Sequence, residues 1–410
     1  MEVLIAGGGI GGLTLALTLH EQGIPVRVFE AAPEIKPVGV GVTLLPHCTA
    51  VLGRLGLNEA LESVAVSTTT TSFFNRYGQH IYSEETGRHA GYKTPQFQVH
   101  RADLHKLLLD ACRERIGADR IVTGARCVGF EQDETGVRIK LEDRGGHGMT
   151  SYRGDALIGC DGLHSVVRKQ LHPHEGEPRY SGVNMWRGVT RWKPIFDGAT
   201  YVRGGWLTPG KMVIYPIRKE IDADGLQLIN WVVEVTTPKY ERRDWNRQGR
   251  IEDFIHVFED WKFDWLDVPA MIRSAEVLLE FPMIDQDPLP WWTLGKVSLL
   301  GDAAHPMVPR GSNGAGQAIL DADALAAILS RETSVEGALK AYESERLPAT
   351  AEIVRTNRIN PPDAILREVY ERTGDQPFAN IEEVISQEEM VAISERYKRV
   401  AGYDRARLGS

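Results

Sequence analysis

The chain has 410 residues, of which 42% are hydrophobic and 25% charged, and its formal net charge is −9. This composition is typical of a soluble globular protein, and the length suits two or three domain-sized units. The acidic balance disfavours a nucleic-acid partner, and no apolar run approaches the ~20 residues that span a bilayer. The chain enters MEVLIAGGG without a basic and apolar leader, so we expect a cytoplasmic protein with no membrane partner.

The four cysteines show no metal or redox spacing. Cys48, Cys112, Cys127 and Cys160 are far apart, and none belongs to a C-x-x-C motif. This spacing argues against both a zinc site and a redox dithiol, so we expect buried thiols and no bound metal.

The first residues predict a strand, a glycine turn and a helix. Residues 3–6 are apolar, and the turn GGGIGG follows, with Gly7, Gly9 and Gly12 at the spacing G-x-G-x-x-G. The first glycine permits the tight turn, the second lets backbone approach a pyrophosphate, and the third allows close packing of helix on strand. The N–H groups of the helix N-terminus would then face the phosphates. Glycine used for turn geometry alone is the alternative interpretation.

A carboxylate follows this turn at the expected distance. The predicted strand PVRVFE ends at Glu30, 18 residues after Gly12. An acid at this position accepts hydrogen bonds from ribose hydroxyls and suits an adenosine without a 2′-phosphate. The pattern does not distinguish NAD from FAD.

The next segments mix helices and strands. A loop with Gly39 and Gly41 precedes a helical pattern, and residues 68–83 alternate like two strands around a turn at Tyr77 and Gly78. Arg101 precedes an apolar-striped helix and is either a surface charge or a phosphate ligand. Strands are expected over residues 121–141, and DALIGCDGLHSVVRKQL predicts a strand, a turn at Asp161 and a helix.

The second half predicts an antiparallel sheet followed by helices. Residues 179–237 are rich in β-branched and aromatic side chains separated by turn residues. Residues 251–266 are expected to be helical, and residues 297–300 form a short buried strand. From Ser334 onward the pattern is mostly helical, with breaks at Pro348 and at Pro361 and Pro362.

A second glycine loop lies late in the chain, at GDAAHPMVPRGSNGAG, residues 301–316. Gly314 and Gly316 either bring backbone close to a ligand or only pack the next helix on the sheet, and Asp302 either binds a ligand or caps a turn. We interpret His305 as a structural residue and assign it no proton transfer.

Three motifs follow one another along the chain and together resemble one protein family. They are GGGIGG with Glu30, GCDGLHSVVR and GDAAHPMVPRGSNGAGQAILDADALA. Together they resemble the single-component FAD-dependent aromatic hydroxylases, the class A flavoprotein monooxygenases related to p-hydroxybenzoate and salicylate hydroxylases. The resemblance covers residues 1 to about 347. WRGVT, RGSNGAGQAI and NRINPPD look most like the phenazine hydroxylase branch, which acts on a phenazine carboxylate.

The resemblance implies an α/β fold. A Rossmann-like FAD-binding domain, with a parallel sheet and helices, is interleaved with an antiparallel-sheet substrate domain, and helices follow at the C-terminus. We expect the FAD-binding domain over residues 1–70, 98–175 and 283–345. The substrate domain takes residues 71–97 and 176–282, and residues 346–410 form the C-terminal helical segment.

The resemblance also implies the cofactor site. It places Gly7, Gly9 and Gly12 on the FAD pyrophosphate, Glu30 on the adenosine ribose and Asp302 on the ribityl chain. The full expected set is Gly7, Gly9, Gly11, Gly12, Glu30, Gly41, Arg101, Asp161, Asp302, Gly314 and Ala315. NAD(P)H is expected as a transient co-substrate, because no second G-x-G-x-x-G occurs.

The late loop is expected to face the reactive flavin ring. Reduced flavin is anionic, so the backbone N–H groups that start the helix at residues 314–316 suit it. We call residues 309–314 the flavin-facing loop: Pro309, Arg310, Gly311, Ser312, Asn313 and Gly314. Arg310 either pairs with a substrate carboxylate, lies near the flavin or forms a surface ion pair.

Substrate contacts are expected on the predicted sheet, and no catalytic residue is assigned. Arg187, Arg191, Arg203 and Tyr215 lie on its strands, where alternation leaves open whether each lines the cavity or faces solvent.

The sequence therefore predicts an NAD(P)H-driven, FAD-dependent monooxygenase. It would hydroxylate a small aromatic or heteroaromatic acid with O2 through a C4a-hydroperoxyflavin, with decarboxylation as one outcome. A non-oxygenating flavin dehydrogenase and a non-catalytic flavin-binding module are the alternatives. W-x-W-x-I-P is absent, which disfavours a halogenase. A monomer or a homodimer is expected.

Overall fold

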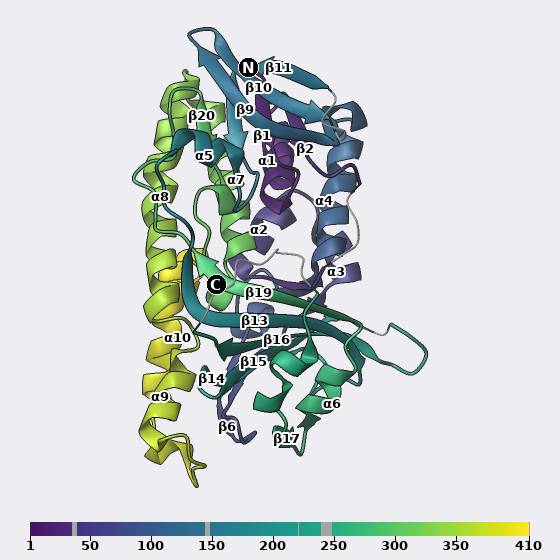
Figure 1. The fold of residues 1–410 in the computed structure, drawn as a ribbon, viewed down its shortest axis with the longest axis vertical. Helices are drawn as coiled ribbons and strands as arrows, with labels where there is room; N and C mark the ends of the chain where they lie inside the picture. The colour runs from purple at the N-terminus through teal and green to yellow at the C-terminus, as the bar shows by residue number, and fades with distance from the viewer. Residues whose placement is uncertain (35–38, 144–147, 220, 239–247, 410) are drawn as a thin grey trace.

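The computed structural model describes residues 1–34, 39–143, 148–219, 221–238 and 248–409. In Figure 1 a sheet that contains the N-terminal strand lies in the upper half and a larger sheet lies in the lower half. One long helix near the C-terminus runs beside both.

The upper sheet is parallel and has five strands in the order β20-β12-β1-β2-β8. Its strands are β1 (Val3–Ala6), β2 (Val26–Glu30), β8 (Ile121–Thr123), β12 (Ala156–Gly159) and β20 (Val297–Leu299). Every residue of β1 and β12 is buried, as expected for a parallel sheet whose faces are covered. The predicted parallel sheet is confirmed.

The lower sheet has seven strands in the order β19-β13-β16-β15-β14-β5-β6. Its strands are β5 (Thr70–Phe74), β6 (His80–Glu85), β13 (Arg179–Trp192), β14 (Thr200–Trp206), β15 (Gly210–Arg218), β16 (Gln227–Thr236) and β19 (Val277–Asp285). Neighbouring strands are antiparallel except β14 and β5, which run parallel. The predicted antiparallel sheet is therefore confirmed, with one parallel pair.

Smaller sheets complete the strand content of the described residues. They are β3 (Gly41–Leu44), β7 (Phe97–His100) and β4 (Val66–Ser67); β11 (Met149–Gly154), β10 (Gly136–Asp143) and β9 (Ala125–Asp133); and β17 (Lys262–Phe263) with β18 (Leu266–Asp267). The expected loop at Gly41 is wrong, because this residue begins β3. Its pairing partner is His100, and such a distant partner leaves no local signal.

Helices surround the upper sheet and continue to the C-terminus. They are α1 (Ile10–Glu21), α2 (Pro46–Arg54), α3 (Asn58–Val64), α4 (Arg101–Arg115), α5 (Val166–Leu171), α6 (Val268–Arg273), α7 (Gly314–Arg331), α8 (Val335–Ile359), α9 (Ala364–Thr373), α10 (Gln387–Ala401) and α11 (Arg405–Leu408). In Figure 1 α8 is the long helix beside both sheets, and α9 and α10 lie near its lower part. None of the described helices is both long and apolar enough to cross a membrane.

Two expectations about helices are wrong. The helix α8 continues through Pro348, where Pro348 and Ser344 are exposed, so water can satisfy the carbonyl that the proline leaves without a donor. Residues 251–266 are not an α-helix but short 3-10 turns followed by β17 and β18. Their buried Phe254, Phe258 and Trp261 repeat at helical spacing, which successive 3-10 turns also produce.

Candidate active site

In the first glycine loop, neighbouring atoms lie too close to leave room for side chains at several positions. Gly7 has a φ of +105°, and a Cβ added there would lie 2.3 Å from the Cys160 carbonyl oxygen. A Cβ on Gly12 would lie 2.0 Å from the Gly7 carbonyl oxygen. A Cβ on Gly11 would lie 2.9 Å from a Leu300 side-chain carbon, so this glycine lets α1 pack closely. These three glycines are required by the fold itself.

Gly9 differs, because a Cβ there would meet nothing within 4 Å among the described residues. It is the N-cap of α1, where no described side chain caps the helix and the first turn has no acidic residue. The N–H groups of this turn therefore face open space, and an anion would satisfy them. This cradle fits the pyrophosphate of FAD.

Glu30 lies at the end of β2 beside the loop. Its Oε2 accepts from the Gly8 N–H at 2.7 Å, and its Oε1 accepts from the Ala32 N–H at 2.7 Å. His105 on α4, which the sequence did not predict, donates from Nε2 to the Gly8 carbonyl at 2.5 Å. Gly8 is thus held from both sides, and Glu30 is positioned next to the loop where the ribose is expected.

Arg101 and Asp302 are the two expected cofactor-binding residues of opposite charge that act on each other. Arg101 is the first residue of α4, and both side chains are accessible to solvent. Surrounding protein lowers the pKa of Arg101 by desolvation, and the Asp302 carboxylate opposes this shift, so the two charges interact. A Cβ on Gly314 would lie 3.8 Å from Asp302 Oδ1. The start of α7 therefore lies next to Asp302, the residue expected to bind the ribityl chain.

Asp161 is engaged by the protein. Burial raises its pKa, while hydrogen bonds from Ser165 Oγ, from the Val166 N–H at 2.7 Å and from the Val167 N–H at 3.3 Å oppose the rise. Its carboxylate thus anchors the start of α5. On this helix Arg168, also missed by the sequence, donates to the Ala303 and Ala304 carbonyls at 3.0 and 2.9 Å. The Asp-Gly motif therefore supports the Gly-Asp motif, and its contact with cofactor stays a prediction.

His305 lies in a buried group of charged side chains. Its Nε2 is 2.6 Å from Asp321 Oδ2, and Arg346 donates to Asp321 Oδ1 at 2.7 Å. All three side chains are buried. These contacts match the structural role that the sequence suggested for His305.

The flavin-facing loop turns sharply before α7. Residues Pro309–Gly311 form a 3-10 turn, and Ser312 adopts a left-handed φ of +54°. Helix α7 then starts at Gly314, with Ala315 half-buried and no acidic residue in the first turn. The first N–H groups of α7 have no acceptor within the helix, and the positive end of the helix would suit an anionic reduced flavin.

Gly41 joins this region to the large sheet. Its N–H donates to Asn230 Oδ1 at 2.6 Å, and its carbonyl accepts from Arg187 Nη2 at 2.6 Å. A Cβ there would lie 2.5 Å from the Tyr215 ring. Burial raises the pKa of Tyr215 to about 12, against the charge of Arg187. Arg187 and Tyr215 therefore point inward, whereas Arg191 is exposed and pairs with Glu276 at 2.6 Å.

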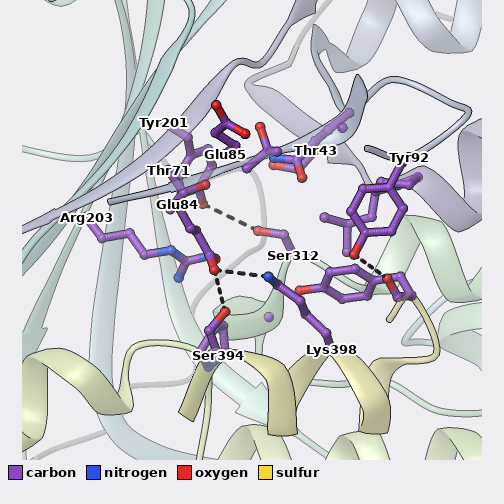
Figure 2. Close-up of a pocket in the computed structure, with 18 of the residues that line it drawn as sticks. Thr43, Thr71, Glu84, Glu85, Tyr92, Tyr201, Arg203, Ser312, Ser394 and Lys398 are labelled. Carbon is purple, nitrogen blue, oxygen red and sulfur yellow. Dashed lines mark hydrogen bonds and ion pairs between the residues drawn. The ribbon is translucent and has the colours of Figure 1, made fainter. Parts of the chain in front are cut away.

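A pocket that is partly open to solvent lies between the large sheet, the flavin-facing loop and α10. Figure 2 shows its polar groups. The aromatic residues that line it are Phe73, Tyr92, Tyr201 and Tyr403; the loop contributes Gly311 and Ser312; the charged residues are Arg203, Lys398, Glu84 and Glu85. Tyr201 Oη lies 3.4 Å from Ser312 Oγ, which links sheet and loop (Figure 2). An aromatic molecule placed here would lie beside the flavin-facing loop.

One end of the pocket is closed by α10. Glu84 accepts from Ser394 Oγ at 2.6 Å and from Lys398 Nζ at 3.0 Å (Figure 2). Tyr92 Oη donates to the Tyr403 carbonyl at 2.7 Å. The C-terminal segment therefore forms part of the pocket wall, which the sequence did not predict.

A buried charge cluster lies behind the pocket. Arg203 pairs with Asp363, which also pairs with Lys211 at 2.6 Å. Lys211 pairs with Glu234 at 2.7 Å, and Arg310 lies 3.8 Å from the same carboxyl group. Within the described part of the chain, three cations thus meet two carboxylates. The burial of Arg203 disfavours its charge, but Asp363 outweighs this and raises the pKa of Arg203.

The comparisons with known proteins decide the family. Residues 1–246 and 284–357 match the FAD binding domain family. The chain is 43% identical to phenazine 1,6-dicarboxylic acid hydroxylase PhzS from Lysobacter antibioticus, over 87% of this chain and 89% of that protein. This chain belongs to the FAD-dependent aromatic hydroxylases. It is also 32% identical to 3-hydroxybenzoate 6-hydroxylase 1 from Aquipseudomonas alcaligenes, over 87% and 88% of the two chains.

Solved structures share the fold of this hydroxylase. A salicylate hydroxylase substrate complex aligns with a TM-score of 0.75 at 23% identity, covering 100% of this chain and 97% of that chain. HpxO from Klebsiella pneumoniae, complexed with FAD and uric acid, aligns with a TM-score of 0.75 at 23% identity, covering 96% of each chain. The predicted family, fold, enzyme class and FAD cofactor are confirmed.

Proposed function

We propose that this hydroxylase inserts one atom of O2 into a small aromatic or heteroaromatic carboxylic acid. NADH or NADPH supplies two electrons, the second oxygen atom leaves as water, and the ring gains a hydroxyl group in place of hydrogen or, with decarboxylation, of the carboxylate. The hydroxylases of a phenazine dicarboxylate and of 3-hydroxybenzoate, both similar in sequence, support an aromatic acid. FAD supplies the electron transfer and oxygen activation when bound.

The observation that carries the acid specificity is Arg203. This side chain lines the pocket and is 7% exposed, and its Nε has no hydrogen-bond partner among the described residues. Among the residues that the structure describes, the cluster that contains it holds one more cation than carboxylates. A buried excess charge is costly unless an anion compensates it. A substrate carboxylate at Arg203 would supply that anion beside the flavin-facing loop.

The remaining predicted residues keep their roles as proposals. Gly9 and the first turn of α1 bind the pyrophosphate, Glu30 the ribose, Asp302 the ribityl chain, and the start of α7 the flavin ring. Tyr201 and Phe73 form part of the pocket wall around the aromatic substrate. We further propose the division into an FAD-binding domain, a substrate domain and a C-terminal helical segment, a cytoplasmic location, and a monomer or homodimer.

The function is tested with the FAD-loaded protein and a panel of aromatic acids. Oxidation of NADH or NADPH is followed with product mass under ¹⁸O2. A hydroxylated product carrying one labelled oxygen supports the proposal. Coenzyme oxidation without labelled product for any acid would instead indicate a dehydrogenase or an uncoupled oxidase.

The role of Arg203 is tested with Arg203→Gln. This change leaves Asp363 paired with Lys211 and the cluster neutral, so the fold is retained. We expect KM for the acid to rise roughly tenfold to a hundredfold, because a charge-assisted hydrogen bond is lost. Arg191→Gln, on the exposed side of the same sheet, is the control and should leave KM unchanged. An unchanged KM in Arg203→Gln would contradict this role.

A further inference from the structure

The C-terminal helix α10 reaches the flavin-facing loop through one side chain. Tyr397 is 2% exposed, and its hydroxyl accepts from Asn313 Nδ2 at 2.9 Å and donates to Asn357 Oδ1 at 2.7 Å. Asn357 in turn donates from Nδ2 to the Val308 carbonyl at 3.3 Å. The Tyr397 hydroxyl therefore connects Val308, which precedes the loop, with Asn313 near its end.

The middle of the loop touches the same hydroxyl. A Cβ on Gly311 would lie 1.4 Å from Tyr397 Oη and 2.9 Å from Asn357 Oδ1. Asn313 Nδ2 also donates to the Gly311 carbonyl at 3.0 Å. The glycine is thus needed because a side chain from another part of the chain occupies the space of its Cβ.

The loop needs such support, because its conformation is strained. Ser312 has a φ of +54°, a left-handed conformation that costs energy in a residue other than glycine. Neighbouring contacts must hold it, and those around Asn313 are buried hydrogen bonds. Burial raises the pKa of Tyr397 above its ordinary value, so the hydroxyl keeps its proton and donates to Asn357 at working pH.

We propose that Tyr397 is a positioning residue for the flavin ring: its hydroxyl fixes the loop at Gly311 and Asn313 and thereby the N–H groups at the start of α7. This inference rests on the proposed function for the placement of the ring at residues 309–314. The family match ends at residue 357, so this support comes from a segment that follows the matched part of the chain.

The test compares Tyr397→Phe with the wild-type protein, both titrated with FAD and with no aromatic compound present. We expect the FAD dissociation constant to rise roughly tenfold, the effect of losing one well-placed hydrogen bond, and the visible absorption bands of bound FAD to shift. Tyr180→Phe is the control, because the Tyr180 hydroxyl also lies within hydrogen-bond distance of described acceptors, the Thr237 carbonyl at 2.8 Å and Asn184 Oδ1 at 3.2 Å. The control should lose stability without changing the flavin spectrum.

A second variant tests the contact itself. Gly311→Ala should displace the loop in the wild-type background and change the flavin spectrum. In a Tyr397→Leu background, which removes the hydroxyl and most of the ring, the same alanine should have a smaller effect. Such non-additivity is expected for groups in direct contact.

The proposal is overturned if Tyr397→Phe binds FAD with wild-type affinity and an unshifted spectrum, or if Tyr180→Phe shifts the spectrum equally. Additive effects of Gly311→Ala and Tyr397→Leu would also overturn it. Because no aromatic acid is used, these results are independent of whether the chain hydroxylates one.

Discussion

The two glycine loops look alike in sequence but are constrained by different surroundings. At Gly7 and Gly12 an added Cβ would collide with backbone carbonyls within 2.3 Å, inside the strand-turn-helix unit and its neighbouring strand. At Gly311 the obstacle is the Tyr397 side chain from the C-terminal segment, and at Gly314 the nearest atom is 3.8 Å away. The first loop is thus constrained by backbone of the parallel-sheet unit, whereas the second is constrained by a side chain from the C-terminal segment.

This difference separates folding from cofactor binding within a single motif. Gly9 and Gly314 border open space, so substitutions there should act on FAD before they act on the fold. Gly7 and Gly12 should behave in the opposite way.

The largest effect is expected for Gly12→Ala. Alanine ordinarily stabilises a helix relative to glycine by about 1 kcal/mol, but here its Cβ would lie 2.0 Å from the Gly7 carbonyl oxygen. The clash should prevail and lower the free energy of unfolding by about 3 kcal/mol. Urea unfolding of the apoprotein measures this, and an unchanged midpoint would show that the loop can relax.

Gly9→Ala should separate apoprotein stability from FAD affinity within the first loop. With a φ of −74° and no described atom within 4 Å of the new Cβ, the apoprotein should lose only about 1 kcal/mol of stability, because alanine is a poorer N-cap than glycine. The methyl group would stand between backbone and pyrophosphate, so the FAD dissociation constant should rise roughly a hundredfold. Fluorescence titration with FAD checks this. A lower unfolding midpoint with intact FAD affinity would contradict the comparison.

Gly314→Val should give the corresponding result in the second loop. The new side chain would project beside Asp302, where the structure leaves room, so we expect a change of less than about 1 kcal/mol in apoprotein stability. The FAD dissociation constant should rise roughly tenfold with a shifted flavin spectrum, because the helix N-terminus is held away from the ring. Ala327→Val, at an exposed position of the same helix, is the control. Loss of folding before loss of FAD affinity would indicate a purely structural loop.

The smallest effect concerns pH and a histidine that packs beside α7. His47 is buried, its Cε1 lies 3.5 Å from the position of a Cβ on Gly316, and burial followed by the charge of Arg346 lowers its pKa from 6.5 to about 3. Below about pH 6.5 His47 is therefore protonated in the unfolded chain but stays neutral in the folded chain. Stability from this group is complete above pH 6.5 and is lost as the pH falls from 6.5 toward 3.

When the pH is lowered from 7 to 5.5, the free energy of unfolding of the wild-type protein should fall by about 1 kcal/mol more than that of His47→Gln. Urea unfolding at the two pH values measures the difference, in which other titrating groups cancel. His20→Gln, on the exposed part of α1, should behave as the wild type. Equal pH dependence in His47→Gln and wild type would show that His47 titrates normally.

Much of the fold could be predicted from sequence, but parts of the site could not. Strand-forming residues predicted the antiparallel sheet, and the family resemblance implied the parallel one. Periodicity failed at residues 251–266, where buried aromatic residues at helical spacing belong to separate 3-10 turns. Arg203 was one of several candidates on alternating strands. Its partner Asp363 lies 160 residues away, inside the quoted NRINPPD, and no local pattern links the two.

The sequence alone determined the features whose causes are local. The tight packing of Gly12 on Gly7, the helix that follows and the carboxylate at Glu30 depend on backbone geometry within about 30 residues. Only the tertiary structure decided that Arg187 and Tyr215 face inward while Arg191 faces solvent, and that Tyr397 supports Gly311. These choices depend on which distant segments pack together, because side-chain direction and close contact are fixed by long-range packing rather than by neighbours in the chain.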